Sequence, residues 1–206
     1  MSFKKREAVI IGITGSFGTG KTTVAKMFKA LGATVLDADK LAHASFKKGT
    51  NPYKKIVNIF GRRILDRFGR IDRIKLAHLV FRNKKSLNKL CNIIHPVVVD
   101  KIMESIEKIL RTKTAPAVVI DAPLLVEAGL HKVTDYLIVV KTSRPTQIKR
   151  VMKKTGLPAS QIIKRIKNQI PLIKKIQMAD YVINNEGDKR DTKKFVKEAW
   201  RKIKNK

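Results

Sequence analysis

The stretch Gly15-Ser16-Phe17-Gly18-Thr19-Gly20-Lys21-Thr22 decides the fold of this 206-residue chain. Its spacing is G-x-x-x-x-G-K-[ST], in which glycines let the backbone wrap around a polyphosphate with its N–H groups pointing inward. Residues 8–14 are nearly all apolar and rich in β-branched types, which is typical of a buried parallel strand. Residues 23–31 have helical periodicity. The loop therefore joins a strand to a helix N-terminus, as a phosphate-binding loop requires.

The side chains of this loop indicate how ATP would be held. Lys21 would reach the β- and γ-phosphates, and the Thr22 hydroxyl would bind Mg²⁺. The free N–H groups at the start of the helix and the positive end of its dipole add to the attraction. The sequence therefore predicts an ATP site made by successive residues, namely Gly15, Ser16, Phe17, Gly18, Thr19, Gly20, Lys21, Thr22 and Thr23.

The net charge of +30 is extreme, and no Asp or Glu occurs between Tyr136 and Ala179. A highly anionic substrate, a nucleic acid or a general preference for lysine would each explain this charge. The lysines are scattered over many predicted helix faces, which favours the general preference, with an anionic substrate accounting for the charge locally. Aromatic content is low, and no basic–aromatic alternation suggests base stacking, so we expect no specific nucleic-acid partner.

The sequence also predicts where the protein works. No apolar run approaches the ~20 residues of a membrane span. The single cysteine, Cys91, excludes an internal disulfide and lies on an apolar helical stripe that is typical of a core thiol. The basic residues 4–6 and the apolar run after them resemble a signal peptide, but that run leads straight into the loop without a small-residue cleavage site. We expect a cytoplasmic protein with no membrane partner, either a monomer or a weak homo-oligomer.

Strand patterns alternate with helical patterns along the chain, which predicts a parallel, doubly wound α/β sheet. Residues 40–95 contain several helical patterns and no convincing strand, so they predict a helical insertion. We expect Pro96 to open a separate helix over 97–110, because proline is well tolerated at the first helical position. The strands are predicted at 8–14, 34–37, 117–121, 136–140 and 181–183, and the helices of the second half at 145–154, 158–168 and 191–204.

Two predicted strands end in carboxylates, at the edge of a parallel sheet where ligands bind. Asp121 follows four apolar residues, as does the acid on the Mg²⁺ side of P-loop enzymes, so Thr22 and Asp121 are the predicted metal ligands; the alternative is that Asp121 caps a helix or turn. The second predicted strand ends in Asp37-Ala38-Asp39, so Asp39 would lie further along the extended backbone than Asp37. Asp39 is better placed to take a proton from an acceptor hydroxyl, unless it only caps the helix beginning near Lys40.

The chain resembles the dephospho-CoA kinase family along most of its length. The phosphate-binding loop is shared by many activities, but the Asp-Ala-Asp, His-Pro and Pro-Leu-Leu-x-Glu series in this order is far more specific. The resemblance rests on Gly12-Ile13-Thr14-Gly15, Gly18-Thr19-Gly20-Lys21-Thr22, Asp37-Ala38-Asp39, His95-Pro96, Pro123-Leu124-Leu125-Val126-Glu127, Gln147 with Arg150, Arg165, Gln169 and Ala179-Asp180-Tyr181-Val182-Ile183-Asn184-Asn185-Glu186-Gly187.

The resemblance implies transfer of the γ-phosphate of ATP to the ribose 3′-hydroxyl of dephospho-CoA, with Mg²⁺, to give coenzyme A and ADP. It also implies a P-loop kinase-like three-layer α/β/α fold with a five-stranded parallel sheet, a helical acceptor-binding insertion and a mobile lid. The implied boundaries are a core over about 1–40, 112–145 and 178–206, an insertion over about 41–111 and a lid over about 146–177.

The resemblance also implies roles for single residues. Asp39 is the implied general base, and Lys21 and Arg150 complete the catalytic set. Arg150 and Arg165 would belong to the nucleotide and lid side, although either arginine taken alone is more typical of a solvated helix face. Asn184 and Gly187 would lie near the adenine. The implied acceptor-binding residues are Asp37, Asp39, His95, Pro123, Leu124 and Glu127, and the alternative for His95 is that it fills the interior of the insertion.

The sequence departs from the family pattern in two places. Ser16-Phe17 stands where Gly-Ile is more usual, and Gln177 stands where a basic residue is common. Neither position carries an expected chemical role. Two other functions stay open on the sequence: a P-loop kinase for another nucleoside or nucleotide, which an acceptor screen would identify, and a basic P-loop nucleic-acid-binding protein, which a steep salt dependence would identify.

Overall fold

The computed structural model describes residues 8–81 and 83–205. The chain divides into two compact units. The first contains the described residues up to Asp37 together with the chain from Ser105 onward, and the second is Ala38–Glu104. The phosphate-binding loop and the stretch predicted as a lid both belong to the first unit.

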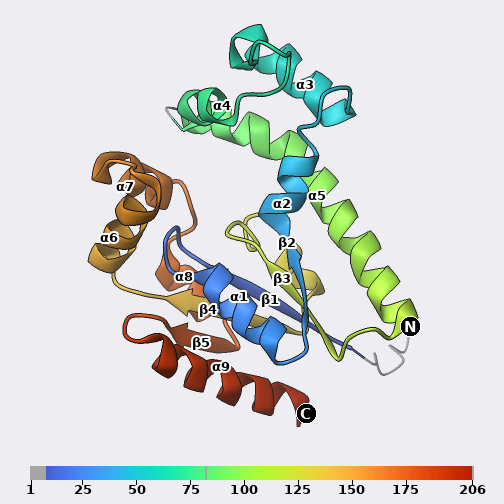
Figure 1. The fold of residues 1–206 in the computed structure, drawn as a ribbon, viewed down its shortest axis with the longest axis vertical. Coiled ribbons are helices and arrows are strands. Elements are labelled where there is room, and N and C mark those ends of the chain that lie inside the picture. Colours follow the sequence, from blue (N-terminus) through green and yellow to red (C-terminus); the bar gives the residue numbers. More distant parts are fainter. Residues whose placement is uncertain (1–7, 82, 206) are drawn as a thin grey trace. The chain divides into compact units, whose positions relative to one another are not determined.

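The first unit is built on a five-stranded parallel sheet with the strand order β2-β3-β1-β4-β5 (Figure 1). The prediction of an α/β fold with five parallel strands is therefore confirmed. Because β1 is the central strand, the loop that follows it emerges between the carboxyl ends of β3 and β4. The strands are β1 (Val9–Gly15), β2 (Thr34–Asp37), β3 (Ala117–Asp121), β4 (Tyr136–Lys141) and β5 (Tyr181–Asn184).

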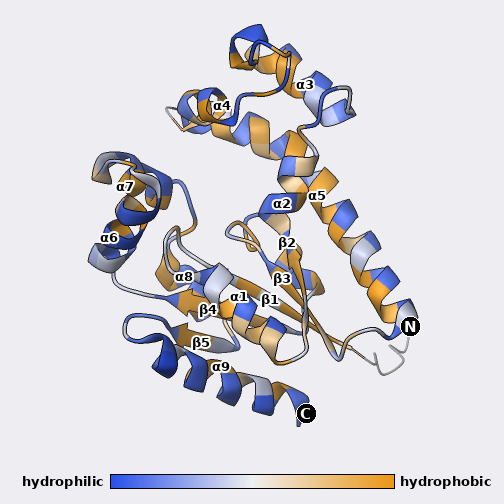
Figure 2. Cartoon of the chain, in the orientation of Figure 1, coloured by the Kyte–Doolittle hydropathy of each residue, from blue (hydrophilic) through white to orange (hydrophobic). Residues whose placement is uncertain are grey.

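Helices α1 (Lys21–Ala30) and α9 (Lys189–Lys204) lie side by side against the sheet (Figure 1). Successive strand residues point to opposite faces, and Ile11 and Ile13 enter the same core as Phe28 of α1 and Val196 of α9. Burial of these side chains is the main force holding the helices to the sheet. Figure 2 shows the strands as hydrophobic and much of α9 as hydrophilic. Because Val196, Ala199 and Ile203 of α9 are nevertheless buried, the helix is amphipathic.

Three helices occupy the stretch predicted as a lid. They are α6 (Arg144–Thr155), α7 (Ala159–Lys167) and α8 (Leu172–Gln177). The first two agree with the predicted helices, whereas α8, which contacts β1 and β4, was not predicted. The η2 turn (Leu130–Val133) lies between β3 and β4.

The second unit is helical in the part that the structure describes. It contains α2 (Ala38–Ala44), α3 (Asn51–Phe60), the 3₁₀ turn η1 (Arg62–Ile64), α4 (Arg73–Val80) and most of α5 (Lys84–Thr112), which continues into the first unit. Side-chain caps begin two of these helices. Thr50 accepts a hydrogen bond from the Tyr53 N–H, and Asp72 accepts from the N–H groups of Ile74 and Lys75.

Two local predictions were wrong. Pro96 does not separate two helices but lies inside α5, where the buried stripe Ile94, Val98 and Ile102 runs past it without interruption. Burial of that stripe offsets the hydrogen bond that proline cannot donate. Asp39 is not extended, because α2 begins at Ala38 and places Asp39 in its first turn. Within the described ranges, no helix combines the length and the apolar character that crossing a membrane requires.

Candidate nucleotide site

The backbone of the loop between β1 and α1 can be built only with glycine at its turning points. Gly15, Gly18 and Gly20 have φ values of 154°, 86° and 89°. A Cβ atom on Gly15 would overlap the Val140 carbonyl oxygen, and one on Gly20 would overlap the side-chain amide of Asn185. The glycines therefore let the loop pass close to β4 and to the end of β5 while turning into the helix.

Lys21 lies at the first position of α1 and is only 9% exposed. Its Nζ atom donates to the Ser16 carbonyl oxygen at 3.1 Å, and the Thr19 hydroxyl donates to the same oxygen at 3.0 Å. The lysine thus lies across the loop that precedes it. Thr22, the next residue, is exposed at the N-terminus of the helix, where free N–H groups favour an anion.

Two carboxylates meet at the carboxyl edge of the sheet. Asp37 of β2 and Asp121 of β3 are register partners, and Asp121 also pairs with Ile13 of β1. Register partners on parallel strands point to the same face, so the two acids are neighbours, and Asp121 is also next to the strand that leads into the loop. Asp121 is buried and Asp37 is half-buried.

Asp121 and the hydroxyl of Thr22 are oxygen donors of the kind that Mg²⁺ prefers. Among the described residues, no group of three or more His, Cys, Asp or Glu side chains could hold a metal ion by itself. The donor set fits a magnesium ion that is bound by few protein ligands and completed by water and phosphate oxygens, which is usual for this ion.

Asn185 connects the far edge of the sheet to the loop. Its Nδ2 atom donates to the Thr19 carbonyl oxygen at 2.7 Å, and its Oδ1 atom accepts from the Thr192 hydroxyl at 3.0 Å. Sequence reasoning assigned Asn184 and Gly187 and missed this residue. The alternation of β5 was an available signal, because Asn185 lies two residues after buried Ile183 and points to the same face.

Arg150 of α6 binds the turn after β5. Its two terminal nitrogens donate to the carbonyl oxygens of Asn185 at 2.7 Å and Glu186 at 3.3 Å. The predicted lid arginine and the predicted adenine-side turn are therefore in direct contact. Asn184 shapes that turn, since its Oδ1 atom accepts from the Glu186 N–H at 3.2 Å, and Gly187 continues it.

The Glu186 carboxylate closes the same turn against the start of α6. It accepts hydrogen bonds from the hydroxyls of Thr142, Ser143 and Thr146 and from the Ser143 N–H. These donors, led by the two threonine hydroxyls, lower the pKa of Glu186 from 4.5 to about 2. The ionised Glu186 side chain thus connects the turn after β5 to the first turn of α6 by hydrogen bonds.

The second predicted lid arginine, Arg165 of α7, lies over the ring of Phe17, with Cζ 5.5 Å from the ring centroid. Burial lowers the pKa of the Arg165 guanidinium, which still stays charged at neutral pH. Phe17 belongs to the Ser16-Phe17 departure from the family pattern. Its ring provides a contact between the tip of the loop and α7.

Pro123 and Glu127, predicted on the acceptor side, contact α8 and the residues before it. Lys175 of α8 is fully buried, and its Nζ atom lies 2.8 Å from a Glu127 carboxylate oxygen and 2.9 Å from the Pro123 carbonyl oxygen. Burial lowers the pKa of Lys175, and the Glu127 charge opposes that shift. Leu124, between them, is half-buried.

Asp39 and His95 belong to the second unit, whereas the other predicted site residues belong to the first. Asp39 is exposed and follows β2 by two residues, and His95 is half-buried on α5. Their roles as general base and acceptor-side residue stay predictions.

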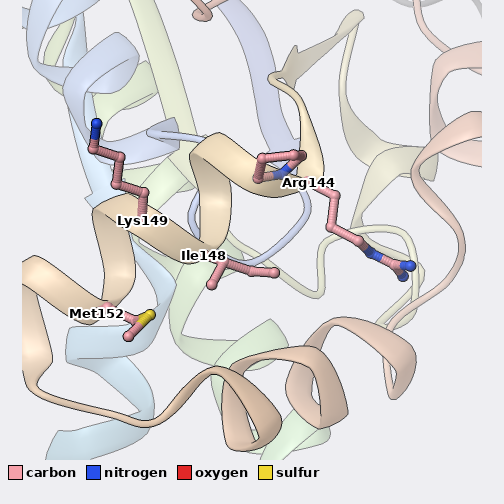
Figure 3. Close-up of a pocket in the computed structure, with 5 residues that line it drawn as sticks. Arg144, Ile148, Lys149 and Met152 are labelled. Atoms are coloured by element: carbon pink, nitrogen blue, oxygen red, sulfur yellow. The ribbon is translucent and has the colours of Figure 1, made fainter.

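A separate apolar hollow lies on α6 (Figure 3). Ile148 and Met152 supply its apolar side chains, while the charged ends of Arg144 and Lys149 point away from each other. The residues of α6 nearest the loop, Gln147 and Val151, belong to the neighbouring stripe of the helix. The hollow is therefore distinct from the contacts that shape the loop.

A central parallel strand, a glycine loop and a lysine at the helix start, with acids at the ends of β2 and β3, define a P-loop kinase. A sequence model described as dephospho-CoA kinase matches residues 9–191. The chain belongs to the dephospho-CoA kinase family.

Individual relatives agree with this assignment. The dephospho-CoA kinase of Aquifex aeolicus (strain VF5) is 43% identical over 94% of this chain and 96% of its own. The solved structure of a dephospho-CoA kinase from Campylobacter jejuni is 27% identical, with a TM-score of 0.67 over 94% of this chain and 96% of its own. A solved Thermus thermophilus protein is 31% identical, with a TM-score of 0.79 over 96% of this chain and 98% of its own.

Proposed function

We propose that this protein transfers the γ-phosphate of ATP to the ribose 3′-hydroxyl of dephospho-CoA, giving coenzyme A and ADP in the cytoplasm. The observation that carries the proposal is the loop that wraps around its own Lys21 beside the Asp37–Asp121 pair, in a chain of the dephospho-CoA kinase family. Phosphoryl transfer needs positioning and charge neutralisation more than covalent chemistry, and this edge of the sheet supplies both.

The loop residues hold the donor phosphates. Backbone N–H groups from 15–23 face the polyphosphate, and Lys21 exchanges its contact with the Ser16 carbonyl oxygen for the β- and γ-phosphate oxygens. Lys21 is preorganised for this exchange because burial and the first turn of α1 restrict its movement.

Thr22 and Asp121 would hold the magnesium ion of the ATP complex. When bound, the ion neutralises charge on the phosphate oxygens and orients the γ-phosphate for in-line attack. Asp37, beside Asp121 on the next strand, adds negative charge that favours a divalent cation at this edge.

The acceptor side is assigned to Asp39, which would take the proton from the ribose 3′-hydroxyl as the oxygen attacks. His95, Pro123, Leu124 and Glu127 would bind or border dephospho-CoA. The guanidinium groups of Arg150 and Arg165 would stabilise charge on the transferring phosphoryl group from the α6–α7 side.

Purified protein, Mg-ATP and dephospho-CoA test the proposal directly, with coenzyme A and ADP measured by mass spectrometry. We expect stoichiometric formation of both products by the unmodified chain.

Lys21→Ala should lower the rate on the order of 10²–10³-fold, because one fixed donor to the phosphates is lost. Lys26→Ala, an exposed lysine on the same helix, is the matched control and should leave the rate unchanged. ATP turnover without coenzyme A would contradict the acceptor assignment and retain the donor site.

A further inference from the structure

Gln169, which follows α7, contacts the tip of the phosphate-binding loop. Its Oε1 atom accepts hydrogen bonds from the Phe17 N–H at 2.8 Å and from the Ser16 hydroxyl at 3.3 Å. The contact spans more than 150 positions of the sequence, and it fixes the peptide whose carbonyl oxygen receives Lys21.

The backbone around Gln169 is held by a buried ion pair. Lys175 is fully buried and contacts both Glu127 carboxylate oxygens, at 2.8 and 3.0 Å. The same carboxylate accepts from the Ile170 N–H at 3.0 Å, directly after Gln169. The Pro123 carbonyl oxygen accepts from Lys175 at 2.9 Å, and the Gln169 amide lies 3.5 Å from it.

A buried charge pair is costly to form and specific once formed, because separating the partners leaves an unpaired charge away from water. Glu127 stands on the segment that follows β3, so the pair attaches α8 to that segment, and the Ile170 hydrogen bond attaches the α7–α8 connection to the same carboxylate. The position of Gln169 is therefore set relative to the same sheet from which the loop emerges.

We infer that Gln169 is a positioning residue of the ATP site and that the Lys175–Glu127 pair holds it in place. Gln169 orients the Ser16–Phe17 peptide before ATP arrives, and this peptide determines where Lys21 and the loop N–H groups lie. The inference rests on the proposed function, because it concerns how the same loop receives ATP.

Preorganisation of a loop lowers the conformational cost of binding its ligand. Loss of Gln169 should therefore weaken ATP binding, since the loop must then order itself on the phosphates. It should leave the affinity for dephospho-CoA unchanged, because Gln169 touches the donor loop. It should also leave the turnover at saturating ATP within about twofold, since the bound phosphates restore the loop.

Gln169→Met tests this directly, because methionine keeps the length of the side chain and loses both hydrogen bonds to the loop. We expect KM for ATP and Kd for a non-hydrolysable ATP analogue to rise about tenfold, which is the effect of losing two hydrogen bonds of ordinary strength. Gln177→Met is the matched control, because Gln177 is exposed on α8 and lies outside this network.

A second pair of variants tests the ion pair as the support of Gln169. Lys175→Met should raise KM for ATP in the same direction, whereas Lys174→Met, its exposed neighbour on α8, should not. The double variant Gln169→Met with Lys175→Met should raise KM no further than the larger single effect, because both residues act through one peptide.

Thermal unfolding separates positioning from mere stabilisation. If Gln169→Met lowers Tm but binds the ATP analogue as tightly as the unmodified chain, the inference is overturned. Unaltered Tm with unaltered binding overturns it as well. Failure of the unmodified chain to bind the analogue or to form coenzyme A would instead contradict the proposed function.

Discussion

The hydrogen bonds within the phosphate side of the sheet unit and those within the helical insertion span very different distances along the sequence. Around the loop, Asn185 binds Thr19 across 166 positions and Gln169 binds Phe17 across 152. In the insertion, the Tyr53 hydroxyl donates to the Gly69 carbonyl oxygen across 16 positions, and Lys48 to Phe68 across 20. The donor site therefore depends on assembly of the whole sheet unit, whereas these contacts of the insertion form within one neighbourhood of the chain.

The comparison indicates that the sheet unit holds the phosphates and that the insertion carries the predicted general base. A phosphate site needs fixed N–H groups and charges, and long-range contacts fix them against the sheet. The insertion carries the predicted base Asp39 on an exposed first turn of α2. Substitutions in the two regions should therefore change different measured quantities, namely ATP binding for the sheet unit and turnover for the insertion.

The largest expected effect tests the insertion. Asp39→Asn should lower coenzyme A formation about 10²–10⁴-fold, because the acceptor hydroxyl loses its general base. Binding of ATP should not change, since the loop belongs to the other unit. Steady-state turnover and calorimetric binding of an ATP analogue give the two readouts.

Asp100→Asn is the matched control for that variant, because Asp100 is an exposed acid on α5 of the same unit. Near-normal turnover by Asp39→Asn would remove the base assignment. Weakened ATP binding by the same variant would contradict the division between the two regions.

A smaller effect is expected for the long-range contacts. Asn185→Ala leaves the Thr19 carbonyl oxygen and the Thr192 hydroxyl without this buried partner, which should lower the free energy of unfolding by about 1–3 kcal/mol. Urea denaturation measures the change. Asn92→Ala, an exposed position on α5, should change stability by less than about 0.5 kcal/mol. Equal effects of the two variants would show that the hydrogen bonds of Asn185 do not stabilise the fold.

The smallest expected effect concerns pH. The folded-state pKa of Glu186, about 2, lies below its ordinary value of 4.5, so its contribution to stability is complete above about pH 4.5 and is lost as the pH falls toward 2. Glu186→Gln should therefore flatten the dependence of Tm on pH in this window. Glu198→Gln, an exposed acid on α9, serves as the control. A slope identical to that of the unmodified chain would show that the Glu186 hydrogen bonds do not form in solution.

The elements that sequence reasoning predicted well are those with a strong local signal. β2 over 34–37 and β3 over 117–121 match their predicted bounds, because runs rich in β-branched residues end at carboxylates. The failure at α8 has both a local and a long-range cause. Six residues of α8 show no clear helical period, and their lysine at 175 is buried only because Glu127, 48 positions earlier, pairs with it.

Within the site, the loop could be predicted because its glycines and lysine act through their own backbone and their neighbours. The alternation of β5 indicated that Asn185 is buried, but its partners, like those of Lys175, could not be assigned, because an asparagine after a strand or a lysine on a helix has many roles. The approach of β5 and α8 to the loop supplies those partners.

The sequence by itself determined the strand–loop–helix unit and the parallel α/β class, and it indicated the family. The unit and the class follow from steric limits at glycine and from the burial of apolar stripes, which act over a few residues at a time. The family was indicated by the resemblance of a series of motifs along the chain. Only the tertiary structure decided that Asp37 lies beside Asp121, that Arg150 binds the turn after β5, and that Gln169 holds the loop. Those contacts depend on strand order and register, which no short stretch of sequence encodes.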